Sequence, residues 1–348
     1  IRHANLIMPN KQYLLAFSGG VDSVVLAELL FHSGIHFSIA HVNFSLRAKE
    51  SEGDQSFAEE TAKRYKLPFY TTKFETDKIA SEQKKGIQEI ARELRYDWFQ
   101  ELVKENDFDA VITAHHADDN IETVWMNLLR GTGLQGLSGM NLKKGGIHKN
   151  IIRPLLFATK KDIIEFAKQE SLSWREDSSN AHSDYTRNYL RNEIVPAINE
   201  AFPNASANML QNINRLKDTG VLLDFLSEQY IKKWMQKKGE EIHLPVLKII
   251  KIPGYASLMH HILSNFSFTA NQIQEAVSLL HAETGKYLQN ETHRIIRNRA
   301  WLIIAPLKQT QTIGAVVESQ DTFIETDFFE LKIEHGDQKN MPVSKLPH

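Results

Sequence analysis

YLLAFSGGVDSVVLAELL, residues 13–30, is an apolar run and a helical pattern separated by a turn of serine, glycine and aspartate. Tyr13–Phe17 has the composition of a short buried strand. Val24–Leu30 repeats apolar residues at helical spacing until Gly34, which is a typical C-terminal stop. The turn between them therefore opens the N-terminus of a helix.

The turn also has the composition of a phosphate-binding loop. Its glycines tolerate positive φ and let the backbone approach a ligand closely, and its serines offer hydroxyls beside the open N–H groups of the helix. A helix N-terminus favours anions, most naturally phosphate. The alternative is an ordinary capping turn, because Asp and Ser are common N-caps. The residues of the predicted anion site are Ser18, Gly19, Gly20, Val21, Asp22 and Ser23.

Strand and helix patterns alternate over the first half of the chain. Further strands are predicted at residues 35–44, 69–74, 108–116 and 150–156, and helices at residues 53–68, 86–105, 118–131 and from 159 onward. Such alternation predicts an α/β fold with a doubly wound parallel sheet, whose ligands lie at the carboxyl ends of the strands. The glycine turn and His115 both follow predicted strands.

The alternation stops after Tyr185, where the pattern becomes mainly helical with breaks at Pro196 and Pro203. We therefore predict three parts: an α/β catalytic domain over residues 1–205, a smaller α-rich domain over 206–305, and a linker or the start of an incomplete unit over 306–348.

Composition restricts the class of protein. The 348 residues are 42% hydrophobic and 24% charged, which is typical of a soluble globular chain. No apolar run long enough to span a membrane and no signal-peptide core appear, so we expect a cytoplasmic protein. The net charge of -2 argues against a uniformly basic surface. The chain has no cysteine, which excludes disulfides, thiolate metal sites and cysteine nucleophiles.

Two other nucleotide-binding signatures are not fulfilled by this sequence. GTGLQG, residues 131–136, has the dinucleotide-binding pattern of glycines but follows a helix instead of joining a strand to a helix. No Walker sequence is present. The phosphate site is therefore assigned to residues 18–23.

An acidic segment, TAHHADDNIET, follows the fourth predicted strand at residues 113–123. Asp119 and Glu122 share one face of the helix, where like charges are destabilising unless a cation or an amine lies between them. We predict a magnesium or amine site there. The alternative is an acidic first turn favoured by the helix dipole, beside a surface histidine.

Two arginine pairs lie on predicted helices. Arg92 and Arg95 either pair with acids on the helix surface or face a phosphate. Arg187 and Arg191, beside Asn188, follow a polar loop and either bind RNA or belong to a solvated linker helix.

Together these segments resemble the tRNA(Ile)-lysidine synthase family of the N-type ATP pyrophosphatases, from about Leu14 to Pro196. Residues 283–304 resemble the second domain of that family, and Phe44 stands where members commonly carry His. The segments that carry the resemblance are SGGVDS, HVNFSLR, QEIARELRY, TAHHADDNIET, RGTGLQGLSGM, RPLL, DSSN and YTRNYLR. Members often have a third domain, which we expect to begin near the end of this sequence.

The resemblance implies a reaction with ATP, Mg²⁺, L-lysine and a tRNA(Ile) that has a CAU anticodon. ATP adenylates the C2 oxygen of the wobble cytidine (C34), pyrophosphate leaves, and the lysine ε-amine displaces AMP. Residues 18–23 would hold the pyrophosphate, and Ala40, His41 and Val42 would flank adenine.

The remaining assignments concern the acids and the basic residues. Asp22, Asp119 and Glu122 are the candidate magnesium ligands; the last two would also bind the lysine ammonium and accept its proton, and His115 or Arg95 would stabilise the departing phosphate. The candidate tRNA contacts are Arg187, Asn188, Arg191, Lys286, Arg294, Arg297 and Arg299. The last four could equally form a solvated basic face, and a homodimer is left open.

Three other kinds of protein are alternatives to this assignment. A tRNA thiolase on this fold would need cysteine or an iron–sulfur cluster, and the chain has no cysteine. An ammonia-using synthetase would need no tRNA. A nucleotide-gated RNA-binding protein would bind ATP without releasing pyrophosphate.

Overall fold

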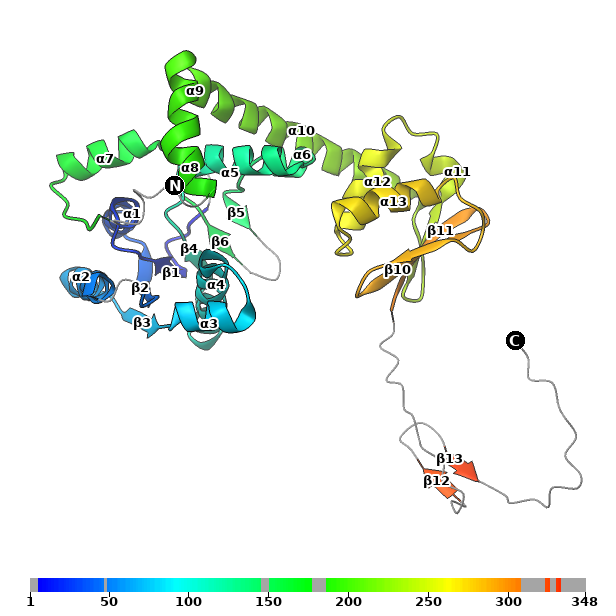
Figure 1. Ribbon diagram of the computed structural model, residues 1–348, viewed down its shortest axis with the longest axis horizontal. Coiled ribbons are helices and arrows are strands. Elements are labelled where there is room, and N and C mark those ends of the chain that lie inside the picture. The colour runs from blue at the N-terminus through cyan, green and yellow to red at the C-terminus, as the bar shows by residue number, and fades with distance from the viewer. Residues whose placement is uncertain are drawn as a thin grey trace, which may run out of the picture. The chain divides into compact units, whose positions relative to one another are not determined.

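The computed structural model describes residues 6–46, 49–144, 150–176 and 186–307, and the two short strands 323–325 and 330–332. The chain divides into two compact units, Ile1–Phe225 and Leu226–His348, and each is described by itself (Figure 1).

The first unit is built on a sheet with the strand order β3-β2-β1-β4-β6-β5 (Figure 1). All neighbours are parallel except β5, which pairs antiparallel with β6 at one edge. The strands are β1 (Gln12–Ala16), β2 (His36–Asn43), β3 (Phe69–Lys73), β4 (Ala110–Ile112), β5 (Lys143–Lys144) and β6 (Ile151–Ile152). The predicted doubly wound parallel sheet is confirmed.

Helices follow the strands. Those of the sheet region are α1 (Val21–His32), α2 (Lys49–Tyr65), α3 (Thr76–Gln83), α4 (Ile87–Glu105), α5 (Ala117–Arg130), α6 (Leu134–Leu137) and α7 (Lys160–Gln169). A helical region then runs through α8 (Thr186–Tyr189), a π-helix (Leu190–Ile194), α9 (Val195–Ala201) and α10 (Ala205–Trp234).

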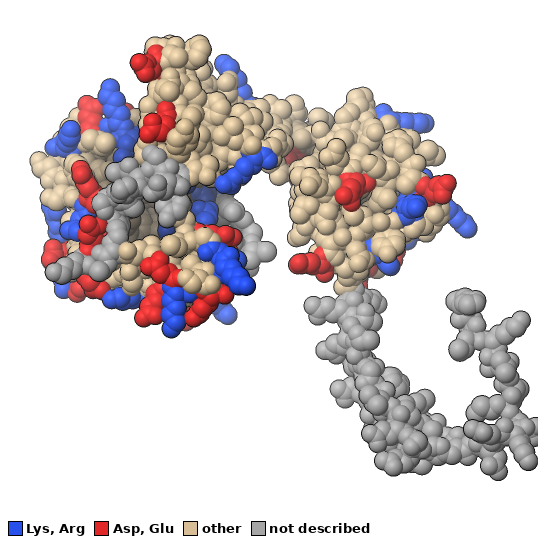
Figure 2. Space-filling view, viewed as in Figure 1, with Lys and Arg blue, Asp and Glu red and all other residues tan. Residues whose placement is uncertain are grey.

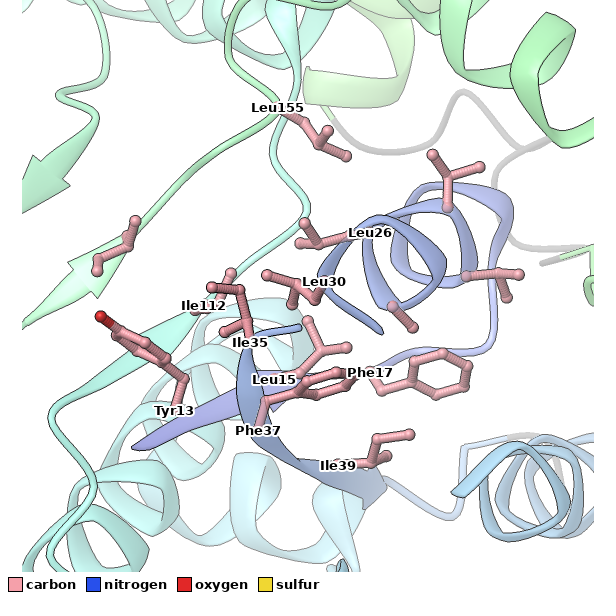
Figure 3. Packing of buried hydrophobic residues seen from close by; sticks show 14 of the residues in the cluster. Tyr13, Leu15, Phe17, Leu26, Leu30, Ile35, Phe37, Ile39, Ile112 and Leu155 are labelled. Carbon is pink, nitrogen blue, oxygen red and sulfur yellow. The ribbon is translucent and has the colours of Figure 1, made fainter. Parts of the chain in front are cut away.

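The alternation of β1 places apolar side chains on both faces of the sheet. Tyr13, Leu15 and Phe17 belong to the core that includes the apolar face of α1 (Figure 3). Leu14 lies in a separate core with Phe99, which comes from α4. Because successive side chains of a strand point to opposite faces, a continuous apolar run requires a helical layer on each side.

The order in which strands are added to the sheet reverses at β1. From β1 the chain passes to β2 and β3 on one side, and later to β4 and β6 on the other. The segments that leave β1 and β4 therefore diverge at the carboxyl edge of the sheet, where α/β folds bind ligands. Two segments lie where the strand order reverses: Ser18–Ser23, which follows β1, and Thr113–Thr123, which follows β4.

The helical region differs from its prediction at one proline. Pro203 lies in the gap between α9 and α10, as predicted, but Pro196 does not break the chain's helical course. It occupies the first turn of α9, directly after the π-helix, and a proline is tolerated there because first-turn N–H groups have no partner within the helix.

The second unit contains a sheet that was not predicted. Its antiparallel strands, in the order β7-β8-β11-β10-β9, are β7 (Gln236–Lys238), β8 (Glu241–Pro245), β9 (Tyr287–Gln289), β10 (His293–Asn298) and β11 (Trp301–Pro306). The helices α11 (Val246–Ile249), α12 (Tyr255–Ser264) and α13 (Ala270–Leu279) complete the unit. A core around Met259, Leu263, Ile295 and Leu302 holds the helices on this sheet.

The expected smaller second domain is thus present. Its α-rich character was predicted, but its short strands were not. β7 is polar and fully exposed, so it is held by its pairing with β8 and not by an apolar pattern of its own. Most of residues 306–348 lies outside the described part. The two described strands of this stretch, β12 (Phe323–Glu325) and β13 (Glu330–Lys332), form an antiparallel pair. None of the described helices is both long and apolar enough to cross a membrane.

Candidate active site

The phosphate loop, Ser18–Ser23, is braced by its own residues. The Ser23 hydroxyl accepts the backbone N–H of Gly19 at 3.1 Å and donates to the carbonyl oxygen of Gly20 at 2.9 Å. Gly19 has a φ of +86°, a left-handed conformation that favours glycine. No side chain caps α1 at its N-cap residue, Gly20. The first-turn N–H groups of α1 are thereby left for an anion.

Neighbouring strands fix the base of this loop. Phe17 donates its backbone N–H to Ala40 at 2.9 Å, and the Nδ1 of His41 bonds to the carbonyl oxygen of Phe17 at 3.0 Å. Burial lowers the pKa of His41, so its imidazole stays neutral near pH 7 and donates from Nδ1. The predicted adenine-flanking residues Ala40 and His41 are both buried, whereas Val42 is partly exposed. In this structure, His41 therefore orients the phosphate loop.

Asp22, in the first turn of α1, pairs with a lysine that the sequence analysis did not select. The Nζ of Lys160 lies 2.7 Å from Oδ1 and 2.9 Å from Oδ2 of Asp22. The two residues are separated by 138 positions, so no local pattern could have indicated the contact.

His116 is a second residue that the sequence analysis missed. Its side chain is 5% exposed and lies among three acids: Nε2 is 3.4 Å from Asp119 and 3.9 Å from Asp22, and Nδ1 is 3.4 Å from Asp118. Burial lowers the pKa of His116, but the neighbouring carboxylates outweigh burial and leave that pKa raised. The adjacent histidines in the sequence were the only signal, and they did not show which one faces the acids.

His115, the predicted catalytic histidine, has the opposite electrostatic environment. Its Nδ1 lies 2.9 Å from the hydroxyl of Thr113. Burial, reinforced by the positive charges of Arg153, Arg187 and Arg92, outweighs the charge of Asp119 and lowers the pKa of His115 to about 4. At pH 7 the ring is neutral, so it acts as a hydrogen-bonding group and not as a cation.

The predicted acids and the predicted RNA-binding arginines form one ion-pair group, the acid–arginine cluster of Asp119, Glu122, Arg187 and Arg191. The Glu122 side chain is 3% exposed; it accepts Nε of Arg187 at 2.7 Å and Nε of Arg191 at 2.6 Å. Nη2 of each arginine lies 3.1 Å from Oδ1 of Asp119. Guanidinium groups thus supply the positive charge that two neighbouring carboxylates require.

The cluster also perturbs the titration of Asp119. Burial raises the pKa of Asp119, but the positive charges of His116 and Arg187 outweigh burial, so that this pKa is lowered. Asp119 is therefore ionised in the neutral pH range. Its carboxylate also accepts the backbone N–H of His116 at 3.0 Å, which fixes the start of α5.

Arg95 lies near the same edge of the sheet. Its guanidinium carbon is 5.2 Å from the ring centroid of Phe44, the position at which the sequence departs from the resembled family. The side chain is exposed to solvent, yet the surrounding protein desolvates it enough to lower its pKa. Nearby, Arg153 is buried, and its Nε has no hydrogen-bond partner.

The candidate RNA-binding residues of the second unit differ in their exposure to solvent. Lys286, Arg294 and Arg299 are exposed, whereas Nε and Nη1 of Arg297 are buried without a partner. Positive and negative side chains are interspersed on the face in Figure 2, in keeping with the net charge of -2. Asn188 is partly exposed on α8; Tyr185 and the DSSN segment, residues 177–180, lie outside the described residues.

The candidate magnesium ligands are not brought together as one set. Among the described residues, no group of three or more acidic or histidine side chains could hold a metal ion. Asp119 and Glu122 are paired with arginines, whereas Asp22 lies within the phosphate loop and is paired with Lys160. Because Mg²⁺ is usually bound by one or two carboxylates together with substrate phosphates, Asp22 is the predicted ligand whose position fits such a site.

Comparisons with known proteins agree with this geometry. Residues 2–198 match the model of the PP-loop domain, and residues 236–307 match that of the TilS substrate binding domain. A tRNA(Ile)-lysidine synthase of Parabacteroides distasonis is 32% identical over 92% of this chain and 72% of its own length. The corresponding enzyme of Porphyromonas gingivalis is 34% identical over 86% of this chain and 64% of its own length.

A solved structure supports the fold alone. The U34-tRNA thiolase of Methanococcus maripaludis, which carries a [4Fe-4S] cluster, has a TM-score of 0.51 and 19% identity over 61% of this chain and 73% of its own. The two matched family models and the close relatives together show that the chain belongs to the tRNA(Ile)-lysidine synthase family.

Proposed function

We propose that this protein uses ATP to join lysine to C2 of the wobble cytidine of a tRNA(Ile) with a CAU anticodon. The adenylated cytidine is the intermediate, and the products are lysidine, AMP and pyrophosphate. The observation that carries the proposal is the phosphate loop at the uncapped N-terminus of α1, within a chain that belongs to the tRNA(Ile)-lysidine synthase family.

In the first step, the loop holds the pyrophosphate part of ATP. The N–H groups of the first turn of α1 supply donors that are already oriented, which favours a charged phosphate over water. Asp22 would hold a magnesium ion together with the phosphates, and the ion would supply neutralisation of their negative charge. Arg95 is exposed and positively charged, so it can contact the phosphate that remains on the cytidine.

His115 contributes to the same step as a neutral ring. With a pKa of about 4, it offers one donor and one acceptor at pH 7. Its Nδ1 is engaged with Thr113, so Nε2 is the atom available to the reacting groups. Stabilisation by positive charge of the cytidine-bound phosphate, which departs with AMP in the second step, is therefore assigned to Arg95.

In the second step, the acids and the arginines of the acid–arginine cluster would separate, and each would bind a new partner of opposite charge. Free lysine has a pKa of about 10.4 and arrives as an ammonium, which must lose a proton before attack. Asp119 and Glu122 would bind this ammonium and accept its proton. Arg187 and Arg191, which now neutralise these acids, would turn to RNA phosphate. Each charge keeps an opposite partner throughout the exchange, because lysine and RNA supply the replacements.

The wobble cytidine lies in a single-stranded loop, so it can leave its stack at a cost of about a few kcal/mol. Arg187, Asn188 and Arg191 are the proposed contacts along its approach. In the second unit, Lys286, Arg294, Arg297 and Arg299 are proposed to contact the tRNA backbone. A cytoplasmic location is expected from these substrates, and the mass of the protein in solution tests whether it forms a homodimer.

The proposal is tested by the incorporation of labelled lysine into tRNA(Ile) with a CAU anticodon, in the presence of ATP and magnesium. Label should require both ATP and this tRNA, and Asp22→Ala should abolish it. Asp97→Ala serves as the matched control, because Asp97 is exposed on α4. Pyrophosphate release with ammonia as the acceptor, without lysine incorporation, would overturn the substrate assignment.

A second variant tests the lysine site. Asp119→Asn removes the charge that the ammonium needs, so the KM for lysine should rise about tenfold or more while the KM for ATP changes little. Unchanged lysine incorporation would contradict the role of Asp119.

A further inference from the structure

We propose that Lys160 is a phosphate ligand of the nucleotide site, held ready by Asp22 until ATP binds. The inference rests on the proposed use of ATP and adds a residue from outside the phosphate loop. It assigns the Nζ of Lys160 to the oxygens of the pyrophosphate that is released.

The first argument is position. The Nζ of Lys160 bonds to both carboxylate oxygens of Asp22, at 2.7 and 2.9 Å, and Asp22 lies in the first turn of α1. The lysine side chain is 40% exposed and that of Asp22 is 28% exposed, so an incoming anion can reach the pair. Of the three N–H donors of an ammonium, two are used by Asp22 and one is left for the anion.

The second argument is rigidity of the backbone that carries the lysine. The N–H of Lys160 donates to Asp118 at 2.7 Å, and the N–H of Ala117 donates to the carbonyl oxygen of Ala158 at 2.8 Å. A capping box between Thr159 and Asp162 closes the first turn of α7. The start of α7 is thereby fixed to the start of α5, and only the flexible lysine stem has to move.

The third argument is charge. A polyphosphate at the N-terminus of α1 would meet the carboxylate of Asp22, and two anions repel at that distance unless a cation lies between them. Lys160 already lies beside Asp22 and supplies one positive charge there, in addition to the magnesium ion that Asp22 would hold when ATP is bound. The ammonium can keep one contact with Asp22 while it gains one with phosphate.

The simpler reading is that Lys160 only neutralises Asp22. The two readings differ when Asp22 is made neutral. A phosphate ligand is still needed in the Asp22→Asn protein, whereas a residue that acts only through Asp22 becomes irrelevant there.

The test measures binding of inorganic pyrophosphate by calorimetry in metal-free buffer. Lys160→Met should weaken binding about tenfold, as expected for loss of a charge-assisted hydrogen bond, and should do so in both the wild-type and the Asp22→Asn backgrounds. Lys160→Arg should retain most of the affinity. Lys161→Met is the matched control, because Lys161 is exposed on the same turn, and its affinity should be unchanged.

Equal affinity of Asp22→Asn with and without Lys160→Met would overturn the inference. Circular dichroism of each variant identifies any loss of folding, and Lys160→Arg keeps the inference testable if the methionine variant unfolds. Wild-type lysine incorporation is measured in parallel. If the wild type incorporates lysine but Lys160→Met binds pyrophosphate as tightly as the wild type, this inference alone is wrong. If pyrophosphate binding is intact but no lysine is incorporated, the proposed reaction alone is wrong.

Discussion

The phosphate loop and the acid–arginine cluster are two charged sites built in opposite ways. In the loop, Ser23 bonds to Gly19 and Gly20, which are four and three residues away. In the cluster, Glu122 bonds to arginines that are 65 and 69 residues away. A short stretch of sequence can therefore encode the loop, whereas the cluster exists only when the helical region around α8 meets α5.

The two sites also differ in what they leave open. The loop keeps the N-terminus of α1 without a side-chain cap. The cluster satisfies its acids with arginine, so its ligands have to replace existing partners. Substitutions in the cluster should therefore cost more stability than substitutions in the loop.

The largest effect is expected for Glu122→Gln. It removes the more deeply buried of the two carboxylates that Arg187 and Arg191 share. The free energy of unfolding should fall by roughly 3 kcal/mol, the low end for a broken buried pair, because the arginines stay partly exposed and keep their contacts with Asp119. Urea denaturation measures the change. Glu52→Gln, which breaks the exposed pair with Lys73, is the control and should leave the urea midpoint almost unchanged, because solvent screens an exposed pair. Equal losses in the two variants would contradict the distinction between the sites.

A smaller loss is expected for Gly19→Ala in the loop. The new Cβ would lie 3.4 Å from Phe57, an ordinary contact, so the cost comes from the φ of +86° and should be about 1–2 kcal/mol. Gly20→Ala is the matched control: Gly20 has a φ of -72°, and its stability should change by less than about 0.5 kcal/mol. Thermal unfolding of the two variants compares them directly, and equal destabilisation would show that the conformation of Gly19 is not the cause.

Ser23→Ala should cost about 1 kcal/mol, because the N–H of Gly19 loses its acceptor. Expressed as a free energy, the effect of Ser23→Ala on the KM for ATP should exceed its effect on unfolding, since the hydroxyl shapes the loop that holds phosphate. Ser56→Ala removes an exposed hydroxyl that bonds only within α2, and should change neither quantity appreciably. A normal KM for ATP in the Ser23 variant would show that the loop holds its shape without the hydroxyl.

The smallest effect concerns the pH dependence of stability. Burial lowers the pKa of His41, so below pH 6.5 the unfolded chain takes up a proton that the folded chain resists. The contribution of His41 is present above that pH and is lost as the pH falls toward the folded-state pKa. His41→Asn should therefore show a shallower loss of stability between pH 7 and pH 5, measured by urea midpoints. An identical slope in both proteins would mean that other groups control this range.

Much of the fold follows from local patterns. The apolar runs, the stop at Gly34 and the capping pair of Thr159 and Asp162 each depend on neighbours within a few residues, and the structure contains them. The sheet of the second unit was not predicted, because strands such as β7 have no apolar alternation and exist through pairing with a neighbour. Pro196 was misread because the π-helix before it carries the chain into α9.

The same division applies to the site. The sequence by itself determined the phosphate loop, the pair of acids on α5 and the resemblance to the family, because each depends on residue types at fixed short spacing. Only the tertiary structure decided that Lys160 faces Asp22, that His116 rather than His115 lies among the acids, and that arginines occupy Asp119 and Glu122. Ion pairs and burial depend on distance in space, and the chain brings these residues together only when its parallel sheet and the helices around it have formed.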